Sequence, residues 1–125
     1  MKKSIQTNKA PSAVGPYSQA MEMNGILFIS GQVPLVPETG KIIEGSIKEQ
    51  TRRVLQNIEA ILDEAGYKLS DIVKTTVYLK DIQDFGAMNE VYSTVFSEDK
   101  PARAAFAVKD LPMNAMVEID AIAIR

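Results

Sequence analysis

Apolar and polar positions along this chain predict a β-hairpin close to its N-terminus. Two strand-like segments, Gln19–Met23 and Ile26–Ile29, flank the dipeptide Asn24-Gly25. Asn-Gly is the strongest short hairpin signal, because both residues of the favoured tight turn must adopt positive φ. Lys3–Gln6 could form a further short strand before the hairpin. Pro34–Gly45 contains several turn-forming residues and is expected to be a loop.

Two later segments have the spacing of amphipathic helices. The first begins at Ser46, which forms a capping box with Glu49, and ends at Gly66, a typical C-terminal stop. Its apolar positions are Val54, Ile58, Ile61, Leu62 and Ala65. The second helix can be capped by Asp81, and its apolar stripe consists of Phe85, Met88, Tyr92, Val95 and Phe96.

Three more segments are expected to be strands. Ile72–Leu79 is rich in Val, Thr and Tyr and lies between the helices, and Arg103–Val108 and Met116–Ile124 follow them. Strands before, between and after two helices predict an α+β fold, a mixed β-sheet with both helices packed on one face. Residues 1–125 are expected to form a single domain.

The other face of this sheet also requires a cover. Ile26–Ile29, Ala104–Val108 and Ala121–Ile124 are continuous apolar runs, the pattern of strands that are buried on both sides. Two helices cannot cover both faces, and soluble monomers rarely expose a large apolar patch. We therefore infer that another subunit covers the second face.

Composition narrows the chemistry that this chain can perform. With 46% hydrophobic and 24% charged residues, it has the balance of a globular protein. Cysteine and histidine are both absent, which excludes disulfides, thiolate nucleophiles, histidine bases and the usual zinc sites. Neither a phosphate loop nor a dinucleotide fingerprint occurs, so no cofactor and no metal are expected. Any catalysis must use carboxylates, Lys, Arg, Tyr, hydroxyls or backbone groups.

Charge and hydropathy patterning limit the partners. The 14 basic residues are scattered among 16 acidic ones, for a net charge of -2, whereas binding to phosphates needs clustered positive charge. Nucleic acid is therefore not an expected partner. No apolar run approaches the roughly 20 residues that cross a bilayer. Met1-Lys2-Lys3 is followed by polar residues rather than an apolar signal core, so a cytoplasmic protein without a membrane partner is expected.

Arg103 and Glu118 are the main candidates for a functional site. Arg103 begins an otherwise apolar strand, where its planar donors could bind a carboxylate in a bidentate pair. Glu118 interrupts the apolar final strand, and a partly buried carboxylate can hold a water or transfer a proton. From these residues alone, Arg103 could instead extend to the sheet edge or pair with an acidic neighbour, and Glu118 could be a solvated glutamate beside an equally solvated Asp120.

Four other residues are weaker candidates. The turn at Gly15-Pro16 delivers Tyr17 to the start of the hairpin. Ser30-Gly31 ends a buried strand, where the missing side chain would allow a ligand to approach the backbone, although a bulge or a turn explains this glycine equally well. Asn89 lies on the second helix and could also be an exposed polar residue.

Several stretches together resemble the reactive-intermediate deaminase family, also called the YjgF family, and its imine deaminase subgroup RidA. The resemblance covers nearly the whole chain and lies in Ala13–Ala20, Phe28–Pro34, Asp71–Leu79, Pro101–Arg103, Leu111-Pro112 and Val117–Ile119. It implies a chorismate-mutase-like (YjgF-like) fold, assembled as a homotrimer with ligand clefts between the subunits. It also implies hydrolysis of 2-iminobutanoate and 2-iminopropanoate to 2-oxo acids and ammonia.

The resemblance further implies roles for individual residues. Arg103 would hold the substrate carboxylate and Glu118 would orient the attacking water, while Tyr17, Ser30, Gly31 and Asn89 would line the cleft. Many relatives carry Cys where this chain has Ala105. The backbone at Ala105 could still contact a ligand, but regulation through a thiol is not available here.

Other functions remain open at the level of the sequence. The same cleft could bind 2-oxo acids through Arg103 as a regulatory or sensing module, without physiological turnover. An RNA-directed activity, which some relatives have been credited with, finds less support, because the net charge is negative and no basic aromatic surface is evident. For a chaperone-like surface the sequence offers nothing decisive.

Overall fold

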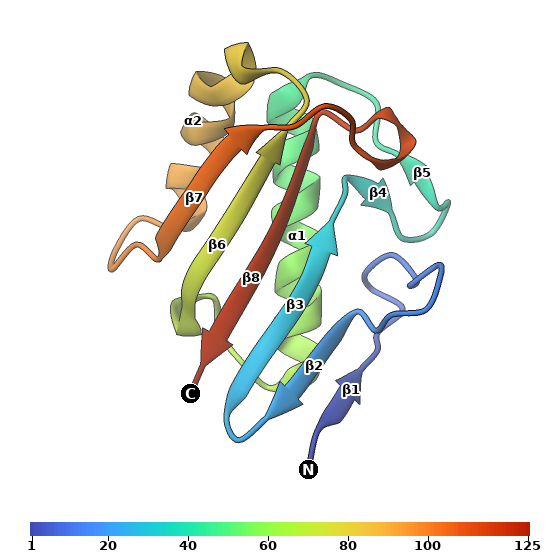
Figure 1. Cartoon of the computed structure of the whole chain (residues 1–125), viewed down its shortest axis with the longest axis vertical. Coiled ribbons are helices and arrows are strands. Elements are labelled where there is room, and N and C mark those ends of the chain that lie inside the picture. The colour runs from blue at the N-terminus through green and yellow to red at the C-terminus, as the bar shows by residue number, and fades with distance from the viewer.

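Six strands form one sheet in the computed structural model, which describes residues 1–125 (Figure 1). They are β1 (Lys3–Ile5), β2 (Ala20–Met23), β3 (Ile26–Gln32), β6 (Ile72–Leu79), β7 (Ala102–Ala107) and β8 (Val117–Ile124). Their order is β1-β2-β3-β8-β6-β7, so the C-terminal strand lies between β3 and β6. All neighbouring pairs are antiparallel except β6 and β7, which are parallel. The predicted mixed sheet is confirmed.

The hairpin predicted at Asn24-Gly25 joins β2 to β3. Asn24 has φ 54° and Gly25 has φ 78°, as a turn with two left-handed residues requires. The turn places Met23 opposite Ile26 and thereby sets the register of the two strands. β1 pairs with β2, so the short strand considered near Lys3–Gln6 is also present.

Both helices, α1 (Ile47–Ala65) and α2 (Phe85–Val95), pack on the same face of the sheet, behind it in Figure 1. At the start of α1, the backbone N–H and the hydroxyl of Ser46 both donate to Oε1 of Glu49, at 2.8 and 2.9 Å. Gly66, with φ 79°, ends this helix in the left-handed conformation. The predicted helix and both of its ends are therefore confirmed.

Asp81 caps a different element from the one predicted. Its carboxylate accepts the backbone N–H of Gln83 at 2.9 Å and caps a short 3-10 turn, Ile82–Asp84. α2 begins only at Phe85, directly after that turn. The residues that cap the helix itself therefore differ from the expectation, although the helical segment is in the expected place.

Apolar side chains from the helices and from one sheet face form the core. Those with no exposed surface include Leu27, Val54, Ile58, Ile61, Leu62, Val77, Met88, Val117 and Ile119. Burying one large aliphatic side chain contributes about 1.5–3 kcal/mol, so this layer is the main favourable term in holding the helices on the sheet.

The sheet face opposite the helices has no cover within the chain, and we refer to it as the uncovered face. Along β8, alternate residues from Val117 to Ala123 are buried, whereas Glu118, Asp120 and Ile122 point the other way. Phe28 and Ile124 lie on the uncovered face and are 50% and 46% exposed. The continuous apolar runs thus supply apolar residues to both faces, as the sequence analysis expected.

The segment Pro34–Gly45 is not entirely the predicted loop. It contains a small hairpin formed by β4 (Leu35–Val36) and β5 (Lys41–Ile42). Each strand has only two residues, too few for an alternating pattern to be recognised in the sequence. Gly40, with φ 69°, donates its backbone N–H to the carbonyl of Val36 and closes the turn.

Candidate functional site

The residues predicted to form one site occupy two places in the chain. We call Arg103, Asn89 and Ala105 the arginine group, and Glu118, Gly31, Ser30 and Tyr17 the glutamate group. The arginine group lies between β7 and α2, on the helix side of the sheet. The glutamate group lies at the end of β3 and the start of β8.

Arg103 is held against α2 from the edge strand β7. It lies opposite Thr75 of β6, a fully buried residue, and so faces the helices. Its Nη1 donates to Oδ1 of Asn89 at 2.7 Å. Its Cζ lies 5.5 Å from the ring centroid of Phe85 and 4.8 Å from that of Tyr92. Because a guanidinium has five N–H donors, most of them remain for a ligand.

An open pocket of about 440 Å³ adjoins the Arg103 side chain. Its lining consists of Asn89, Tyr92, Ser93, Lys100, Pro101 and Arg103. Ala105 lies two residues farther along β7 on the same face as Arg103, opposite the buried Val77. The arginine group therefore offers a half-buried cation with planar donors, which suits a carboxylate.

Glu118 meets Gly31 at a β-bulge between β3 and β8. The register of the two strands shifts between Ile29 and Gln32, which turns the intervening backbone away from the regular ladder. A Cβ atom at Gly31 would lie 2.1 Å from Oε2 of Glu118. Glycine at this position thus leaves the space in which the carboxylate lies. Of the two interpretations weighed for Gly31, the bulge is present, and it is the bulge that brings Glu118 close.

The two residues that follow Tyr17 in the sequence bond to Ser30, which belongs to the glutamate group. The Ser30 hydroxyl donates to the Ser18 carbonyl at 2.7 Å, and the Ser30 backbone N–H donates to the Gln19 carbonyl at 3.0 Å. Tyr17 itself is 53% exposed. It lines an open pocket of about 400 Å³ together with Pro16, Ser18, Ala20, Met21, Phe28, Ile29 and Ser30.

The buried amide of Gln19 ties down the segment that precedes Tyr17. Its Oε1 accepts the backbone N–H of Thr7, and its Nε2 donates to the carbonyl of Pro11, both at 2.8 Å. These bonds satisfy backbone groups that no strand pairs. The loop that carries Tyr17 is consequently fixed at both of its ends.

Burial raises the pKa of Glu118 above its ordinary value, and the neighbouring Asp120 carboxylate raises it further. Tyr78 donates its hydroxyl to Oδ2 of Asp120 at 2.7 Å, and this bond is the largest cause that raises the pKa of Tyr78 to about 12. The hydroxyl therefore stays protonated near neutral pH. Glu118 accepts no comparable hydrogen bond from its own chain, which leaves its lone pairs for water or a ligand.

The two groups do not face each other within one chain. β6 separates β7 from β8, so Arg103 and Glu118 belong to strands about 10 Å apart. Arg103 lies opposite Thr75 and Glu118 opposite Tyr78, which adds roughly 10 Å along the strands. Their side chains also point to opposite sides of the sheet, and neither pocket described above contains both.

Sequence reasoning assigned Phe85 and Tyr92 to the core and did not recognise their contact with Arg103. The spacing of residues along α2 could have indicated this contact. Phe85, Asn89 and Tyr92 are spaced by four and three residues and therefore share one face of α2. Which strand this face meets depends on the tertiary structure. Tyr78 and Asp120 were likewise not recognised as a pair, because they lie 42 residues apart.

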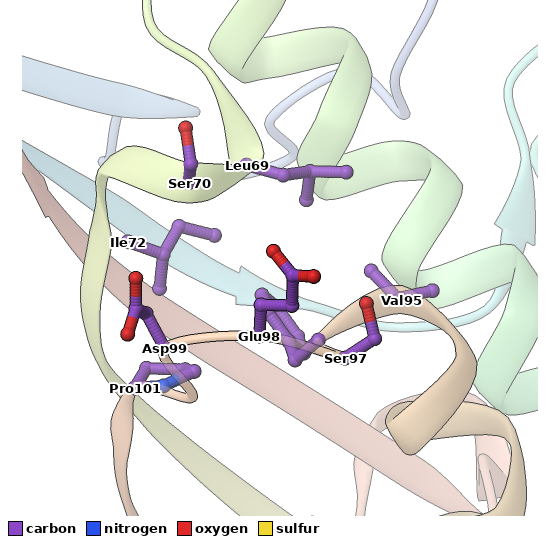
Figure 2. A pocket seen from close by; sticks show the side chains of 9 residues that line it. Leu69, Ser70, Ile72, Val95, Ser97, Glu98, Asp99 and Pro101 are labelled. Atoms are coloured by element: carbon purple, nitrogen blue, oxygen red, sulfur yellow. The ribbon is translucent and has the colours of Figure 1, made fainter.

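A separate cavity of about 290 Å³ lies between the turn Leu69–Asp71 and the C-terminal end of α2. Figure 2 shows Glu98 near Val95 and Ser97, with Asp99 beside Pro101, and four of the nine lining residues are hydrophobic. None of the predicted site residues lines it. No group of three or more metal-ligating side chains is assembled anywhere in the structure, and none of its helices combines the length and apolarity needed to span a bilayer.

Comparison with known proteins gives matches along almost the whole chain. The family model described as "Endoribonuclease L-PSP" matches residues 7–125. A RutC family protein of Pyrococcus abyssi is 57% identical over 122 residues, 98% of this chain and 96% of that protein. The 2-iminobutanoate/2-iminopropanoate deaminase of Mus musculus is 46% identical over 125 residues, 100% of this chain and 93% of that protein. The solved structure of YyfA of Yersinia pestis, a protein of the Rid family, superposes with a TM-score of 0.97 at 46% identity and covers 100% of both chains.

Proposed function

The chain belongs to the reactive-intermediate deaminase (YjgF) family, whose family model is described as endoribonuclease L-PSP, and from this premise we propose that it hydrolyses 2-imino acids to 2-oxo acids and ammonia. The proposed substrates are 2-iminobutanoate and 2-iminopropanoate, after the name of the mouse relative. The observation that carries the proposal is the Arg103 guanidinium. Asn89 holds it beside an open pocket, and its other N–H donors can still bind a ligand. A cytoplasmic location is part of the same proposal.

In this proposal Arg103 binds the substrate carboxylate. Two parallel N–H donors of a guanidinium match the two oxygens of a carboxylate in geometry and charge. Oδ1 of Asn89 accepts one N–H of Nη1, which restricts which of the other guanidinium donors face the ligand. A substrate anchored in this way presents its imine carbon in a defined direction, which is the main requirement for a reaction that also proceeds in water.

Glu118 then acts on the attacking water. The water oxygen bonds to C2 of the imine while Glu118 accepts one water proton and passes it to the imine nitrogen, which gives a carbinolamine. Glu118 then accepts the proton of the carbinolamine hydroxyl and passes it to the amino nitrogen, so that the C–N bond breaks, ammonia leaves and the C2 oxygen becomes a carbonyl. Burial and the charge of Asp120 raise the pKa of Glu118, which makes its carboxylate a stronger base for this step. Neither histidine nor cysteine is required.

The separation of the two groups supports a site that is shared between subunits. The arginine group of one chain and the glutamate group of another would meet if, in a homotrimer, the edge strand β7 of one chain lies beside the uncovered face of its neighbour. The apolar residues of that face, including Phe28, Ile122 and Ile124, suit such an interface. Clefts between subunits would then contain Tyr17, Ser30 and Gly31 from one chain and Arg103, Asn89 and Ala105 from its neighbour.

A regulatory module that binds 2-oxo acids without turnover is the main alternative, because a carboxylate site alone would serve it equally well. An RNA-directed activity, which the family description names, would require clustered positive charge, and the chain has a net charge of -2. Arg103 lies beside two aromatic rings, and Lys100 is the one other basic residue that lines its pocket. These observations favour a small carboxylate.

The deciding experiment generates 2-iminobutanoate in situ and follows the release of 2-oxobutanoate with and without the protein. Arg103→Ala should lose both turnover and binding of 2-oxobutanoate, since a desolvated charge-assisted pair contributes roughly 2–5 kcal/mol. Glu118→Gln should retain most of the binding but lower turnover by about 10²–10⁴. Wild-type protein that binds 2-oxobutanoate without accelerating hydrolysis would instead establish the regulatory alternative.

A further inference from the structure

The guanidinium of Arg103 has aromatic contacts in addition to its hydrogen bond to Asn89. Its Cζ lies 4.8 Å from the ring centroid of Tyr92 and 5.5 Å from that of Phe85. Both rings project from the face of α2 that also carries Asn89. Planar guanidinium groups stack well on such rings, and the contact opposes rotation of the side chain.

The Tyr92 ring is itself held at both ends. Its hydroxyl shares a 2.7 Å hydrogen bond with Oγ1 of Thr75, which is fully buried on β6. Its ring packs against Phe96 with centroids 4.7 Å apart. Burial raises the pKa of Tyr92, so the hydroxyl stays neutral and keeps this bond at physiological pH. The ring therefore provides a rigid surface for Arg103.

We propose that Phe85 and Tyr92 are positioning residues that hold the Arg103 guanidinium in its carboxylate-binding orientation before a ligand arrives. This inference rests on the proposed function, because it assigns a role to residues that act through Arg103. A long arginine side chain at a sheet edge would otherwise lose much rotamer freedom when it binds. In this structure the Arg103 side chain already loses its rotamer freedom when the chain folds, so this entropic cost does not reduce the affinity for a ligand.

Three variants at the two rings test the proposal. Tyr92→Leu and Phe85→Leu each remove one ring and should weaken binding of 2-oxobutanoate by roughly 2- to 30-fold, the range of a single cation–π contact. KM should rise with little change in kcat, since the lost interaction is the same in the ground and transition states. Tyr92→Phe retains the ring and should bind nearly as well as wild type, although it loses the bond to Thr75.

Val91→Ala is the matched control. Val91 is buried on α2, but it precedes Tyr92 by one residue and therefore points about 100° away from it around the helix axis. This variant should lower the melting temperature, as Tyr92→Leu does, while leaving KM and affinity unchanged. If Val91→Ala loses affinity to the same extent as Tyr92→Leu, the effect of the rings is a general loss of packing and the proposal is wrong.

A ligand-free measurement separates this proposal from the proposed function. The chain contains four arginines, so the guanidinium ¹⁵N signals of a ¹⁵N-arginine-labelled sample can be assigned with the Arg103→Lys variant. Rotation about Nε–Cζ exchanges the two Nη groups, and the ¹⁵Nη signals of Arg103 should exchange slowly in wild type and Tyr92→Phe, and faster in Tyr92→Leu. Rapid rotation in wild type would overturn the inference whether or not the protein hydrolyses imines. Slow rotation without any hydrolysis would leave the positioning intact and reject only the proposed function.

Discussion

At Gly31 a single missing side chain decides where the Glu118 carboxylate lies. A Cβ there would lie 2.1 Å from Oε2, so Gly31→Ala must displace the carboxylate from its present position. Displacement of a catalytic group by about 1 Å can lower turnover about 10²-fold, and we expect a loss of this order in kcat with the circular dichroism unchanged. Gly86→Ala is the control, because a Cβ at Gly86 in α2 meets nothing within 4 Å. Gly31→Ala with wild-type kcat would place the reacting water elsewhere.

The pH dependence of turnover tests the environment of the same carboxylate. Burial first, and the Asp120 charge second, raise the pKa of Glu118, so the carboxylate loses its charge at a higher pH than an ordinary glutamate. Asp120→Asn removes the charge and should lower this pKa. The acidic limb of the kcat/KM profile should therefore move to lower pH, and Asp63→Asn on the exposed side of α1 should leave it in place. A limb that does not move with Asp120→Asn would mean that it reports another group.

At the scale of elements, two buried amides of α1 bind the strands that carry the glutamate group. Oε1 of Gln50 accepts the backbone N–H of Met116 at 2.8 Å, two residues before Glu118. Nδ2 of Asn57 donates to the carbonyls of Val33 and Leu35, at 3.3 and 3.0 Å, just after β3. Gln50 and Asn57 are two helical turns apart and therefore point to the same side of α1. The helix thus sets the relative positions of the ends of β3 and β8 as well as burying them.

Asn57→Leu tests this arrangement. The substitution leaves two backbone carbonyls without their partner in a buried place and should lower the free energy of unfolding by about 1–3 kcal/mol. Urea denaturation measures the change. Gln56→Leu, on the exposed side of the same helix, should alter stability by no more than about 0.5 kcal/mol. Equal stability of the Asn57 variant and wild type would show that water replaces the amide without cost.

At the scale of the whole molecule, the uncovered face and the separation of the arginine and glutamate groups both predict a trimer whose sites are shared between subunits. Arg103→Ala and Glu118→Gln proteins should each be nearly inactive, but a mixture that is unfolded and refolded together should regain activity. In a ring of three, every mixed assembly contains one interface at which both groups are intact, so equal mixing should restore roughly a quarter of wild-type turnover. Sedimentation should show a trimer. A refolded mixture that remains inactive, or a folded monomer at micromolar concentration, would contradict the shared site.

The local elements could be predicted from the sequence because short-range chemistry decides them. The left-handed turn at Asn24-Gly25 and the ends of α1 at Ser46 and Gly66 depend on residues that are only a few positions apart. The hairpin β4–β5 was missed because two-residue strands have no periodicity, and α2 starts later than expected because Asp81 caps the 3-10 turn before it. The face occupied by Glu118 follows from the period of two along β8.

The arrangement of the site depended on contacts between distant segments, which no local pattern encodes. The sequence identified Arg103 and Glu118 as unusual charges in apolar strands, and its apolar runs required a second covered face. Only the tertiary structure placed β6 between β7 and β8 and so separated the two residues. It alone brought Gly31 against Glu118 through a bulge and set Tyr92 against both Thr75 and Arg103. Strand order and packing are decided by the lowest free energy of the whole chain, so these neighbours cannot be read from residues that lie dozens of positions apart.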